Sequence, residues 1–491
     1  MEPMVKHISF HVAGAKLVAE VPSKDLGFSP TYVWCPSPSR THRTEPYALP
    51  KSIRLGTRDS VEAGAKFTPP PCAVVLLDEE KKLLVSVNAG KGSHLWNFCE
   101  FNVSNKKLTV TLDLESHSSG RSVCKHVALS LTGATAGEDL QPLLSRGMET
   151  AYPAAFRTPA GRIPDWWRRP IYCGYGDQVA ISLFLEGSGP EARSLAYCTQ
   201  GLYERWLARL NEAGLPIGTV IIDAGWSPGG VWEPYPVQWP DLRGFIDHRH
   251  KEGRRVLLWI PTWLCEGLPD SWCITLGGKR LTADPTNSSY RRFIREKIGR
   301  LLSPGKSGFN ADGFKIDQLQ YTPTERTPRG GEQFGRSFNI TGKHPRLKAY
   351  GNTWGGELLY LLQKEIYTAA KNAKPDALVT SSTVHPYFHD TFDMVRLHDT
   401  GSVDTDVFAA MKARADLARS VLPHHLIDTD NWVHSDYGQW LDYTRRSHQL
   451  GVPCIFYAER FVAGWQKEPL ISTIPLSDVR KIAAVWRSLF Q

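Results

Sequence analysis

Apolar residues follow two different periods along the chain, and the change falls near residue 163. In the N-terminal part, apolar and polar residues alternate in short runs, as in 73–78, 82–90 and 107–116, and turn residues separate the runs. A period of two residues is typical of strands that bury one face. We therefore predict that residues 1–163 form an N-terminal antiparallel β-sandwich domain.

The C-terminal part alternates short apolar runs with longer segments whose apolar residues recur every three or four positions. Such a succession of strands and helices predicts a closed parallel barrel. An open doubly wound sheet would normally carry a G-x-G-x-x-G turn after its first strand, and this chain has none there. The predicted fold class is thus α/β: a (β/α)8 TIM barrel over residues 164–491, preceded by the sandwich. The expected strands are 170–175, 218–223, 255–260, 312–317, 377–382, 393–398, 422–427 and 452–457. The expected helices are 194–212, 290–302, 356–373, 407–420, 439–449 and 477–490.

Two connecting segments are unusually long, 261–287 after the third predicted strand and 321–350 after the fourth. Loops of this length are commonly functional. In a TIM barrel both would leave the C-terminal ends of the strands, where such barrels build their sites. We therefore expect the functional site on that face.

Composition argues against several classes of partner. The net charge of +8 comes from scattered basic residues, which do not form a nucleic-acid footprint. The sequence has no apolar run of membrane-spanning length and no secretory signal pattern, so we expect a cytoplasmic protein without a membrane partner. The nine cysteines lack zinc-ligand spacing, and we expect neither a metal nor another cofactor. The 16 tryptophans mildly favour a carbohydrate partner, and a homo-oligomer is left open.

Polar and aromatic residues gather at the C-terminal ends of the predicted strands. Because these ends share one rim of a barrel, the side chains that follow them are expected to lie close together. Polar turns alone explain some of these positions, but not so many carboxylates at one rim. The residues that we select are Tyr175, Asp223, Trp226, Trp259, Lys315, Asp317, His385, Arg396, Asp399 and Asp430.

Cleavage of a glycosidic bond needs two carboxyl groups that flank it. One protonates the leaving oxygen, and the other attacks carbon or activates water. Asp317 suits the nucleophile, because Lys315 lies two residues earlier on the same strand and faces the same side. A nearby cation favours the ionised form of a carboxylate. The alternative for these two residues is an ion pair in the barrel interior.

Asp399 suits the acid/base, because it follows the sixth predicted strand, across the barrel mouth from the fourth. That placement is compatible with a separation of roughly 5 Å, which is typical of a retaining mechanism. Asp404 and Asp406 compete for this role, but they are better placed to cap the helix that begins near Val407.

Several motifs occur in a fixed order along the predicted barrel. They are Asp-Ala-Gly-Trp at 223–226, Trp-Pro-Asp-Leu at 239–242 followed by His250, Gly253 and Trp259, Phe-Lys-Ile-Asp at 314–317, Arg396 with Asp399, and Asp428 with Asp430. In these motifs the chain resembles the clan of retaining α-glycosidases with a (β/α)8 barrel, which includes α-galactosidase families 27 and 36 and the related α-glucosidase family 31. The likeness is distributed over roughly residues 164–460, and families 36 and 31 usually have an N-terminal β-sandwich.

The resemblance implies roles for the matching residues. Asp317 would be the nucleophile and Asp399 the acid/base. Asp223 and Lys315 would hold sugar hydroxyls, and Trp259 would form part of the pocket wall. No cofactor is implied by the resemblance.

Further positions around the expected pocket concern recognition of the sugar. The resemblance implies that Arg396 binds a hydroxyl near the acid/base. The chain departs from the family patterns at Ala224, at Tyr175 and in the segment around His385, which are positions that read the sugar. The complete set that we assign to substrate binding is Asp223, Trp226, Trp259, Lys315, Arg396, Tyr175, His385 and Asp430.

We therefore expect a retaining, exo-acting α-glycosidase, most like an α-galactosidase, with an oligosaccharide or glycoside as its partner. Alternatives are an α-glucosidase-like activity, a transglycosidase, and a barrel that binds carbohydrate without cleaving it. A metal-dependent barrel hydrolase is a third class, with His385, His389, His424 and His425 as candidate ligands, although no H-x-H or H-E-x-x-H spacing supports it.

Overall fold

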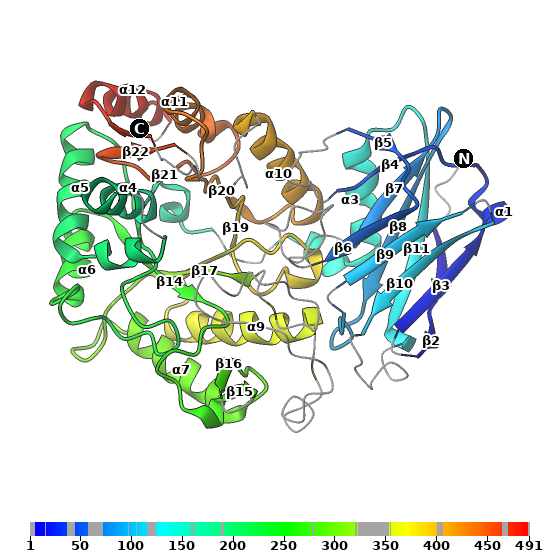
Figure 1. The fold of residues 1–491 in the computed structure, drawn as a ribbon, viewed down its shortest axis with the longest axis horizontal. Coiled ribbons are helices and arrows are strands. Elements are labelled where there is room, and N and C mark those ends of the chain that lie inside the picture. The colour runs from blue at the N-terminus through cyan, green and yellow to red at the C-terminus, as the bar shows by residue number, and fades with distance from the viewer. Residues whose placement is uncertain are drawn as a thin grey trace.

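The computed structural model divides into two regions that are built differently (Figure 1). Antiparallel strands fill the N-terminal region, and alternating strands and helices fill the C-terminal one. The residues that the structure describes are 5–14, 16–36, 45–56, 72–96, 98–104, 106–114, 124–158, 161, 163–187, 191–276, 279–319, 322, 353, 355–399, 406–463 and 470–489.

Eight parallel strands form the C-terminal sheet, in the order β20-β19-β18-β17-β14-β13-β12-β21. The two outermost strands of this order meet at a parallel bridge between Asp428 and Val452, so the sheet is a nearly closed barrel. The predicted parallel barrel of eight strands is thereby confirmed. Its strands are β12 (Ile171–Cys173), β13 (Thr219–Ile222), β14 (Arg255–Pro261), β17 (Gly313–Asp317), β18 (Leu378–Ser381), β19 (Met394–Arg396), β20 (Leu426–Asp428) and β21 (Cys454–Ile455).

Polar side chains fix where many of the barrel helices begin. Thr199, Asp241, Asn287, Asp406 and Asp436 each accept a hydrogen bond from a backbone N–H in the first turn of the helix that follows. Such caps satisfy donors that have no partner within the helix. The helices of this region are α4 (Tyr175–Glu186), α5 (Gln200–Glu212), α6 (Leu242–Lys251), α7 (Ser288–Leu302), α9 (Gly355–Ala373), α10 (Val407–Val421), α11 (Tyr437–Arg446) and α12 (Leu476–Arg487).

The structure differs from the sequence prediction at three of these elements. Helix α4 was not expected, because it is buried along most of its length and shows no one-sided apolar period. Tyr175 consequently begins a helix and does not end the first strand. Helix α6 was also not among the expected helices. The seventh strand begins at Leu426, since residues 422–425 form the turn after α10.

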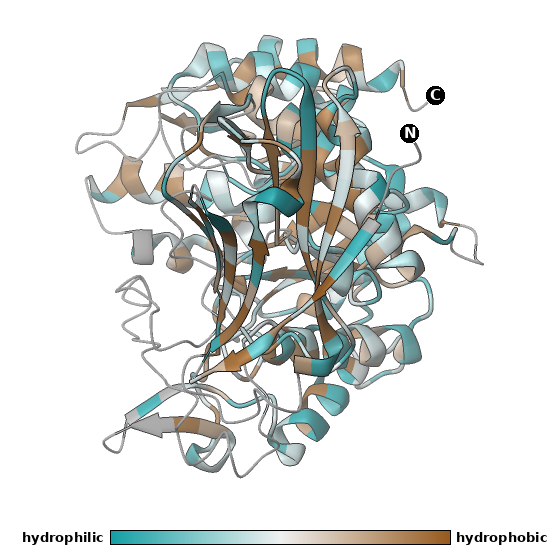
Figure 2. Cartoon of the chain, turned by 90° about the vertical axis from the view of Figure 1, so that its right-hand side faces the viewer, coloured by the Kyte–Doolittle hydropathy of each residue, from teal (hydrophilic) through white to brown (hydrophobic). Residues whose placement is uncertain are grey.

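Two antiparallel sheets make up the N-terminal region, as predicted for a sandwich. One has the order β1-β11-β8-β7-β4-β5 and the other β2-β3-β10-β9-β6. Apolar and polar residues are interspersed along these strands (Figure 2). A helix, α3 (Leu140–Ala151), was not expected here. The elements are β1 (Val5–Ser9), β2 (His11–Ala13), β3 (Lys16–Pro22), α1 (Ser23–Leu26), β4 (Tyr32–Trp34), β5 (Tyr47–Ala48), β6 (Ser52–Gly56), β7 (Ala73–Leu77), β8 (Lys81–Ala89), β9 (Phe98–Val103), β10 (Lys107–Asp113) and β11 (Val127–Thr135).

The two regions contact each other through helices and through polar and aromatic side chains. Helix α3 packs against α10. Gly92 donates its N–H to Oη of Tyr387, and Lys91 donates to the Tyr387 carbonyl oxygen, both at 3.0 Å. The sandwich is thus attached to the segment after β18 and to α10, while a domain boundary at residue 163 stays a prediction.

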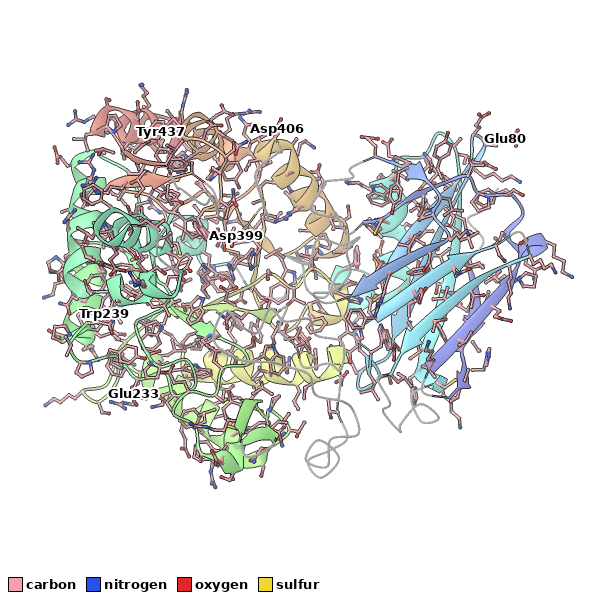
Figure 3. All side chains as sticks on the ribbon, in the orientation of Figure 1. Glu80, Glu233, Trp239, Asp399, Asp406 and Tyr437 are labelled. Atoms are coloured by element: carbon pink, nitrogen blue, oxygen red, sulfur yellow. The ribbon has the colours of Figure 1, made fainter. Side chains whose placement is uncertain are left out.

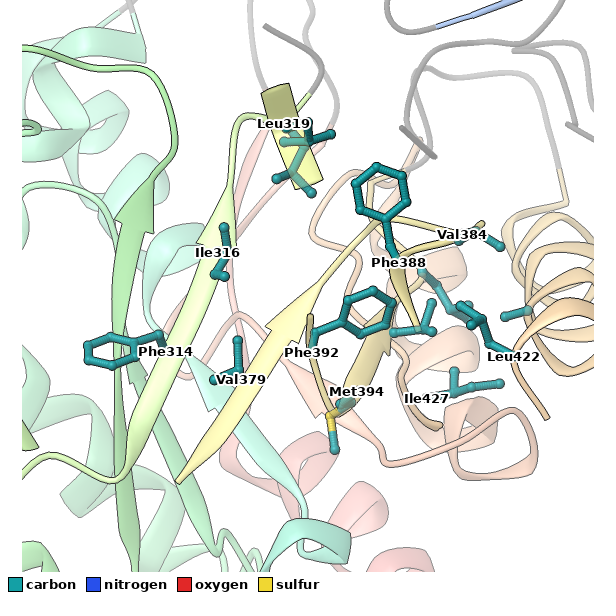
Figure 4. Close-up of a cluster of buried hydrophobic side chains, with 14 of the residues drawn as sticks. Phe314, Ile316, Leu319, Val379, Val384, Phe388, Phe392, Met394, Leu422 and Ile427 are labelled. Carbon is teal, nitrogen blue, oxygen red and sulfur yellow. The ribbon is translucent and has the colours of Figure 1, made fainter. Parts of the chain in front are cut away.

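Strand β17 shows how the barrel separates apolar from polar side chains. Phe314 and Ile316 are fully buried and belong to the apolar cluster drawn in Figure 4. Lys315 and Asp317 occupy the alternate positions and therefore project from the other side of the strand. One face of this strand therefore packs in the apolar core, and the opposite face carries two charged side chains.

Of the two long connecting segments, the structure describes most of the first and almost none of the second. Segment 261–287 contains an antiparallel hairpin of β15 (Cys273–Leu276) and β16 (Lys279–Ala283), so it has more regular structure than expected. Segment 321–350 lies outside the described residues, apart from Thr322. A second hairpin, β22 (Arg460–Val462) with β23 (Ile471–Thr473), follows the last barrel strand. Among the described residues, no helix has the length and apolarity that crossing a bilayer requires.

Candidate active site

Asp317 is the last residue of β17, and its side chain retains 20% exposure. Nε1 of Trp259 donates to Oδ2 at 3.0 Å, and Nη1 of Arg396 donates to Oδ1 at 3.2 Å. Nε2 of His398 lies 3.4 Å from the same Oδ1. Burial alone would raise the pKa of Asp317, but Arg396, His398 and Lys315 hold it well below its usual value. Asp317 is therefore ionised at neutral pH, as a carboxylate nucleophile must be.

Lys315 is almost fully buried and lies within a group of acidic side chains. Its Nζ is 2.7 Å from Oδ2 of Asp223, and the thiol of Cys173 donates to the same oxygen at 3.0 Å. Oδ2 of Asp430 lies 3.9 Å from Nζ. Burial alone would lower the pKa of Lys315, but these carboxylates raise it well above its usual value. Lys315 thus forms an interior ion pair, but with Asp223 and not with Asp317, the partner that the alternative considered.

Arg396 links Asp317 to the segment after β20. Its Nε donates to Oδ2 of Asp430 at 2.5 Å, and its Nη1 also reaches the carbonyl oxygen of Ile316 at 3.1 Å. Burial alone would lower the pKa of Arg396, but Asp430 and Asp317 raise it well above its usual value. The guanidinium thus stays charged and fixes the nucleophile candidate through contacts within the protein.

Asp428 and Asp430 are both fully buried, two residues apart, but they ionise differently. Burial raises the pKa of Asp428 to about 8, and the neighbouring Asp430 charge acts in the same direction. Burial also acts on Asp430, but Arg396 and Lys315 lower its pKa below the usual value. Asp430 therefore carries the negative charge at neutral pH, while Asp428 holds a proton.

Asp399 follows β19 and lies near the centre of the barrel region in Figure 3, with 16% of its side chain exposed. Its backbone N–H donates to Nδ1 of His398 at 2.7 Å. Nη1 of Arg414 donates to the carbonyl oxygens of three successive residues, Leu397, His398 and Asp399, at 2.8, 2.6 and 3.1 Å. Asp317 and Asp399 thus approach opposite nitrogens of one imidazole ring.

Of the two competing carboxylates, the structure describes Asp406. Asp406 lies at the start of α10 (Figure 3), where its Oδ1 accepts from the N–H of Ala409 at 3.0 Å. The prediction that Asp406 caps this helix is confirmed. Asp404 lies outside the described residues.

The structure brings seven of the ten residues selected from the sequence into one network of contacts. Trp226 lies next to this network, whereas Tyr175 and His385 have other surroundings. Trp226 is fully buried and donates its indole N–H to the carbonyl oxygen of Trp259 at 2.8 Å. Tyr175 packs edge-on against Trp432, with ring centroids 5.3 Å apart. His385 lies beside His94 of the sandwich. The seven are Asp223, Trp259, Lys315, Asp317, Arg396, Asp399 and Asp430.

Cys173, His398 and Arg414 are contacts of this network that the sequence analysis did not select. Cys173 ends the first barrel strand, which was a detectable signal, but a lone thiol among apolar residues is usually core. His398 directly precedes Asp399, yet nothing in the sequence indicates its left-handed backbone, with a φ of 60°. Arg414 lies on α10 and reaches the site only through the fold.

The histidines considered as metal ligands contact backbone groups. Nδ1 of His385 accepts from the N–H of Tyr387 at 3.0 Å, and burial holds the pKa of His385 well below its usual value. Nε2 of His425 lies 2.9 Å from the carbonyl oxygen of His389, and Nε2 of His424 lies 2.9 Å from that of Phe156. In the part of the chain that the structure describes, no group of three or more acidic, histidine or cysteine side chains has a metal-binding arrangement.

A cavity of about 510 Å³ lies beside Trp259, the residue that donates to Asp317. Its wall includes Ala224, Tyr235 and Glu266 from the segments after β13 and β14, and Leu195 and Ala196 from the segment before α5. Its size is within the range of small-ligand sites. Trp259 therefore both lines this cavity and donates a hydrogen bond to Asp317, the candidate nucleophile.

The described regions define a nearly closed parallel barrel that follows a two-sheet antiparallel region. Solved structures share this fold. The cycloalternan-degrading enzyme from Trueperella pyogenes is 13% identical over 98% of this chain and 68% of its own, with a TM-score of 0.58. A Kfla1895 mutant in complex with cyclobis-(1->6)-alpha-nigerosyl is 12% identical over 99% of this chain and 67% of its own, also with a TM-score of 0.58.

A third similar structure is a GH31 alpha-xylosidase from a soil metagenome, complexed with xylose. It is 14% identical over 88% of this chain and 56% of its own, with a TM-score of 0.50. The chain thus spans between about half and two thirds of the length of these structures. No family model matches the chain, and no curated protein matches it.

Proposed function

We propose that this protein is a retaining glycoside hydrolase that cleaves terminal α-linked sugars by double displacement. Asp317 attacks the anomeric carbon, and Asp399 protonates the leaving oxygen. Water then releases the sugar from Asp317, while Asp399 takes up a proton from that water. The observation that carries the proposal is the ionised Asp317 at the C-terminal end of a barrel strand, where Trp259 and Arg396 donate hydrogen bonds to its carboxylate.

The similar structures support this proposal and refine the class of sugar. They include a cycloalternan-degrading enzyme in complex with isomaltose or with cycloalternan, and a GH31 alpha-xylosidase complexed with xylose. We therefore place a substrate of the α-glucoside or α-xyloside type ahead of the α-galactoside that the sequence motifs favour. Lys315 pairs with Asp223, and Arg396 pairs with Asp430. These buried pairs hold the side chains around Asp317 in a fixed arrangement, which supports a preorganised site for such a sugar.

A panel of 4-nitrophenyl α-glycosides tests the activity and the sugar together. We expect the wild-type chain to cleave at least one member, the glucoside or xyloside faster than the galactoside, and Asp317→Ala to lose turnover. A wild-type chain that hydrolyses no α-glycoside of the panel contradicts the function. A wild-type chain that cleaves only the galactoside contradicts the refinement and leaves the mechanism in place.

Azide distinguishes the two carboxyl groups by the stereochemistry of the product. In Asp317→Ala, azide replaces the missing nucleophile and attacks once, so a β-glycosyl azide is expected. In Asp399→Ala, Asp317 still forms the intermediate and azide replaces water in the second step, so an α-glycosyl azide is expected. Asp406→Ala is the matched control, because this carboxylate caps a helix, and it should release free sugar as the wild type does.

The leaving group provides a second measure of the acid. Good leaving groups need little protonation, so Asp399→Ala should reduce kcat/KM on poor ones by about 10²–10⁴ and on activated aryl glycosides much less. Equal losses on both kinds of substrate would reject Asp399 as the acid/base.

A further inference from the structure

His398 contacts both carboxyl-bearing residues of the proposed mechanism. Its Nε2 lies 3.4 Å from Oδ1 of Asp317, and its Nδ1 accepts the backbone N–H of Asp399 at 2.7 Å. The ring is almost fully buried, with 5% of the side chain exposed. One imidazole therefore connects the end of β17 with the segment after β19.

The contacts determine which ring nitrogen carries the proton. A backbone N–H can only donate, so Nδ1 of His398 must offer a lone pair to Asp399. Oδ2 of Asp399 also lies near Nδ1, but at 3.6 Å this oxygen is beyond hydrogen-bond distance. With Nδ1 unprotonated, a neutral ring carries its proton on Nε2, which faces Asp317.

The backbone around the two carboxylates is also unusual. Four non-glycine residues of the described chain have a positive φ, and two of them adjoin these carboxylates: Gln318, with a φ of 64°, and His398, with a φ of 60°. Such conformations cost on the order of 1–3 kcal/mol and persist where the surroundings enforce them. At His398 the surroundings include Arg414, whose guanidinium holds three successive carbonyl oxygens of the segment.

We propose that His398 is the positioning residue that sets Asp317 and Asp399 relative to each other, through an Nε2–H towards Asp317 and an Nδ1 lone pair that holds the Asp399 peptide. The inference rests on the proposed function for its kinetic consequences. The tautomer, however, is a property of the unliganded protein, so it is measured without any substrate.

The tautomer is read from the ¹⁵N resonances of the full-length protein labelled at histidine. His398→Asn identifies the His398 signals by their disappearance. The expected pattern is a pyrrole-type Nε2 and a pyridine-type Nδ1. An imidazolium with two pyrrole-type nitrogens, or the opposite tautomer, overturns the proposal whether or not the protein cleaves any glycoside.

Two substitutions separate the contacts of His398 from its backbone conformation. His398→Asn keeps a short acceptor for the Asp399 N–H and tolerates positive φ, but it cannot reach Asp317. His398→Gly removes both side-chain contacts, and glycine adopts this φ without strain. The substrates are aryl α-glycosides of graded leaving-group quality, made from the sugar that the wild type cleaves best.

We expect His398→Asn to lose about 10–100-fold in kcat/KM equally on all leaving groups, because only the ring nitrogen that faces Asp317 is missing. His398→Gly should lose more on poor leaving groups than on good ones, because Asp399 is no longer held in place. If kcat/KM of His398→Gly depends on the leaving group in the same way as that of the wild type, the proposal is overturned. The control is His424→Asn, a histidine whose contact is the carbonyl oxygen of Phe156, and it should keep both the rate and the leaving-group dependence.

If the wild type cleaves no member of the panel, the proposed function fails while the tautomer result still stands. If the wild type is active and His398→Gly resembles His424→Asn, the positioning role alone fails. The proposed function and the positioning role of His398 can therefore be refuted independently of each other.

Discussion

Asp428→Asn tests whether the barrel holds a protonated carboxyl group at neutral pH. The carboxyl of Asp428 is fully buried, and its pKa of about 8 compares with a usual value near 4. The ionisable neighbours that act on it are Asp430, Arg396 and Lys315. An amide has the shape of the protonated acid but never ionises, so the substitution removes the titration with little change in packing.

The sign and size of the effect follow from proton linkage. Between pH 4 and 8 the folded protein binds a proton at Asp428 that the unfolded chain does not bind. The free energy of unfolding therefore falls as pH rises through this window, by at most about 1.4 kcal/mol per pH unit for this one group. The accumulated cost at pH 7 is on the order of 4 kcal/mol. Asparagine avoids that cost but buries an amide donor, which costs about 1–3 kcal/mol.

The assay is urea unfolding followed by tryptophan fluorescence at pH 5, 6, 7 and 8. We expect Asp428→Asn to have about the stability of the wild type at pH 5 and to exceed it by roughly 1–3 kcal/mol at pH 7. Asp430→Asn is the matched control two residues away. It removes the carboxylate that pairs with Arg396, and it should cost about 3–5 kcal/mol at pH 7. A stability advantage of Asp428→Asn that does not grow with pH would refute the reasoning.

Three further predictions concern strand β17 and its partners. Lys315→Met leaves a buried carboxylate without its cation and should lower the free energy of unfolding by about 3–5 kcal/mol, measured by urea titration. Gly313→Ala should cost at least about 2 kcal/mol in the same assay, because a Cβ there would lie 1.9 Å from the carbonyl oxygen of Leu378; a smaller loss would show that the strand shifts freely. Arg396→Gln removes a cation that lowers the pKa of Asp317, so the acid limb of kcat/KM should move to higher pH, and an unmoved limb would contradict this electrostatic role.

The architecture was predictable because hydrophobic periodicity reports which face of an element is buried. Buried and exposed residues alternate along strands such as β3 and β10, and helices such as α7 and α9 present one apolar face. The signal fails along residues 176–182 of α4, because a segment that is buried on all sides has no polar face to set a period.

The site was partly predictable for a similar reason. Residues at the ends of parallel strands must share one rim, so the fold order alone brings Asp223, Lys315 and Asp317 close together. The contacts that set their ionisation were not predictable, because they arise between elements distant in sequence. Arg414 lies on α10, and the tautomer of His398 depends on a backbone conformation that no residue type dictates.

The charges of the buried network also bear on the proposed reaction. Lys315 and Arg396 supply two positive charges, and three carboxylates, Asp223, Asp317 and Asp430, contact them directly. With Asp428 protonated, these two cations and three carboxylates together carry one net negative charge. Asp317 is the most exposed of the five side chains, at 20%. A glycosyl transfer step develops positive charge on the sugar ring, so this imbalance favours the transition state over the neutral substrate. An ionised Asp428 would add a second negative charge deep in the barrel, far from solvent, which explains why the network keeps that proton.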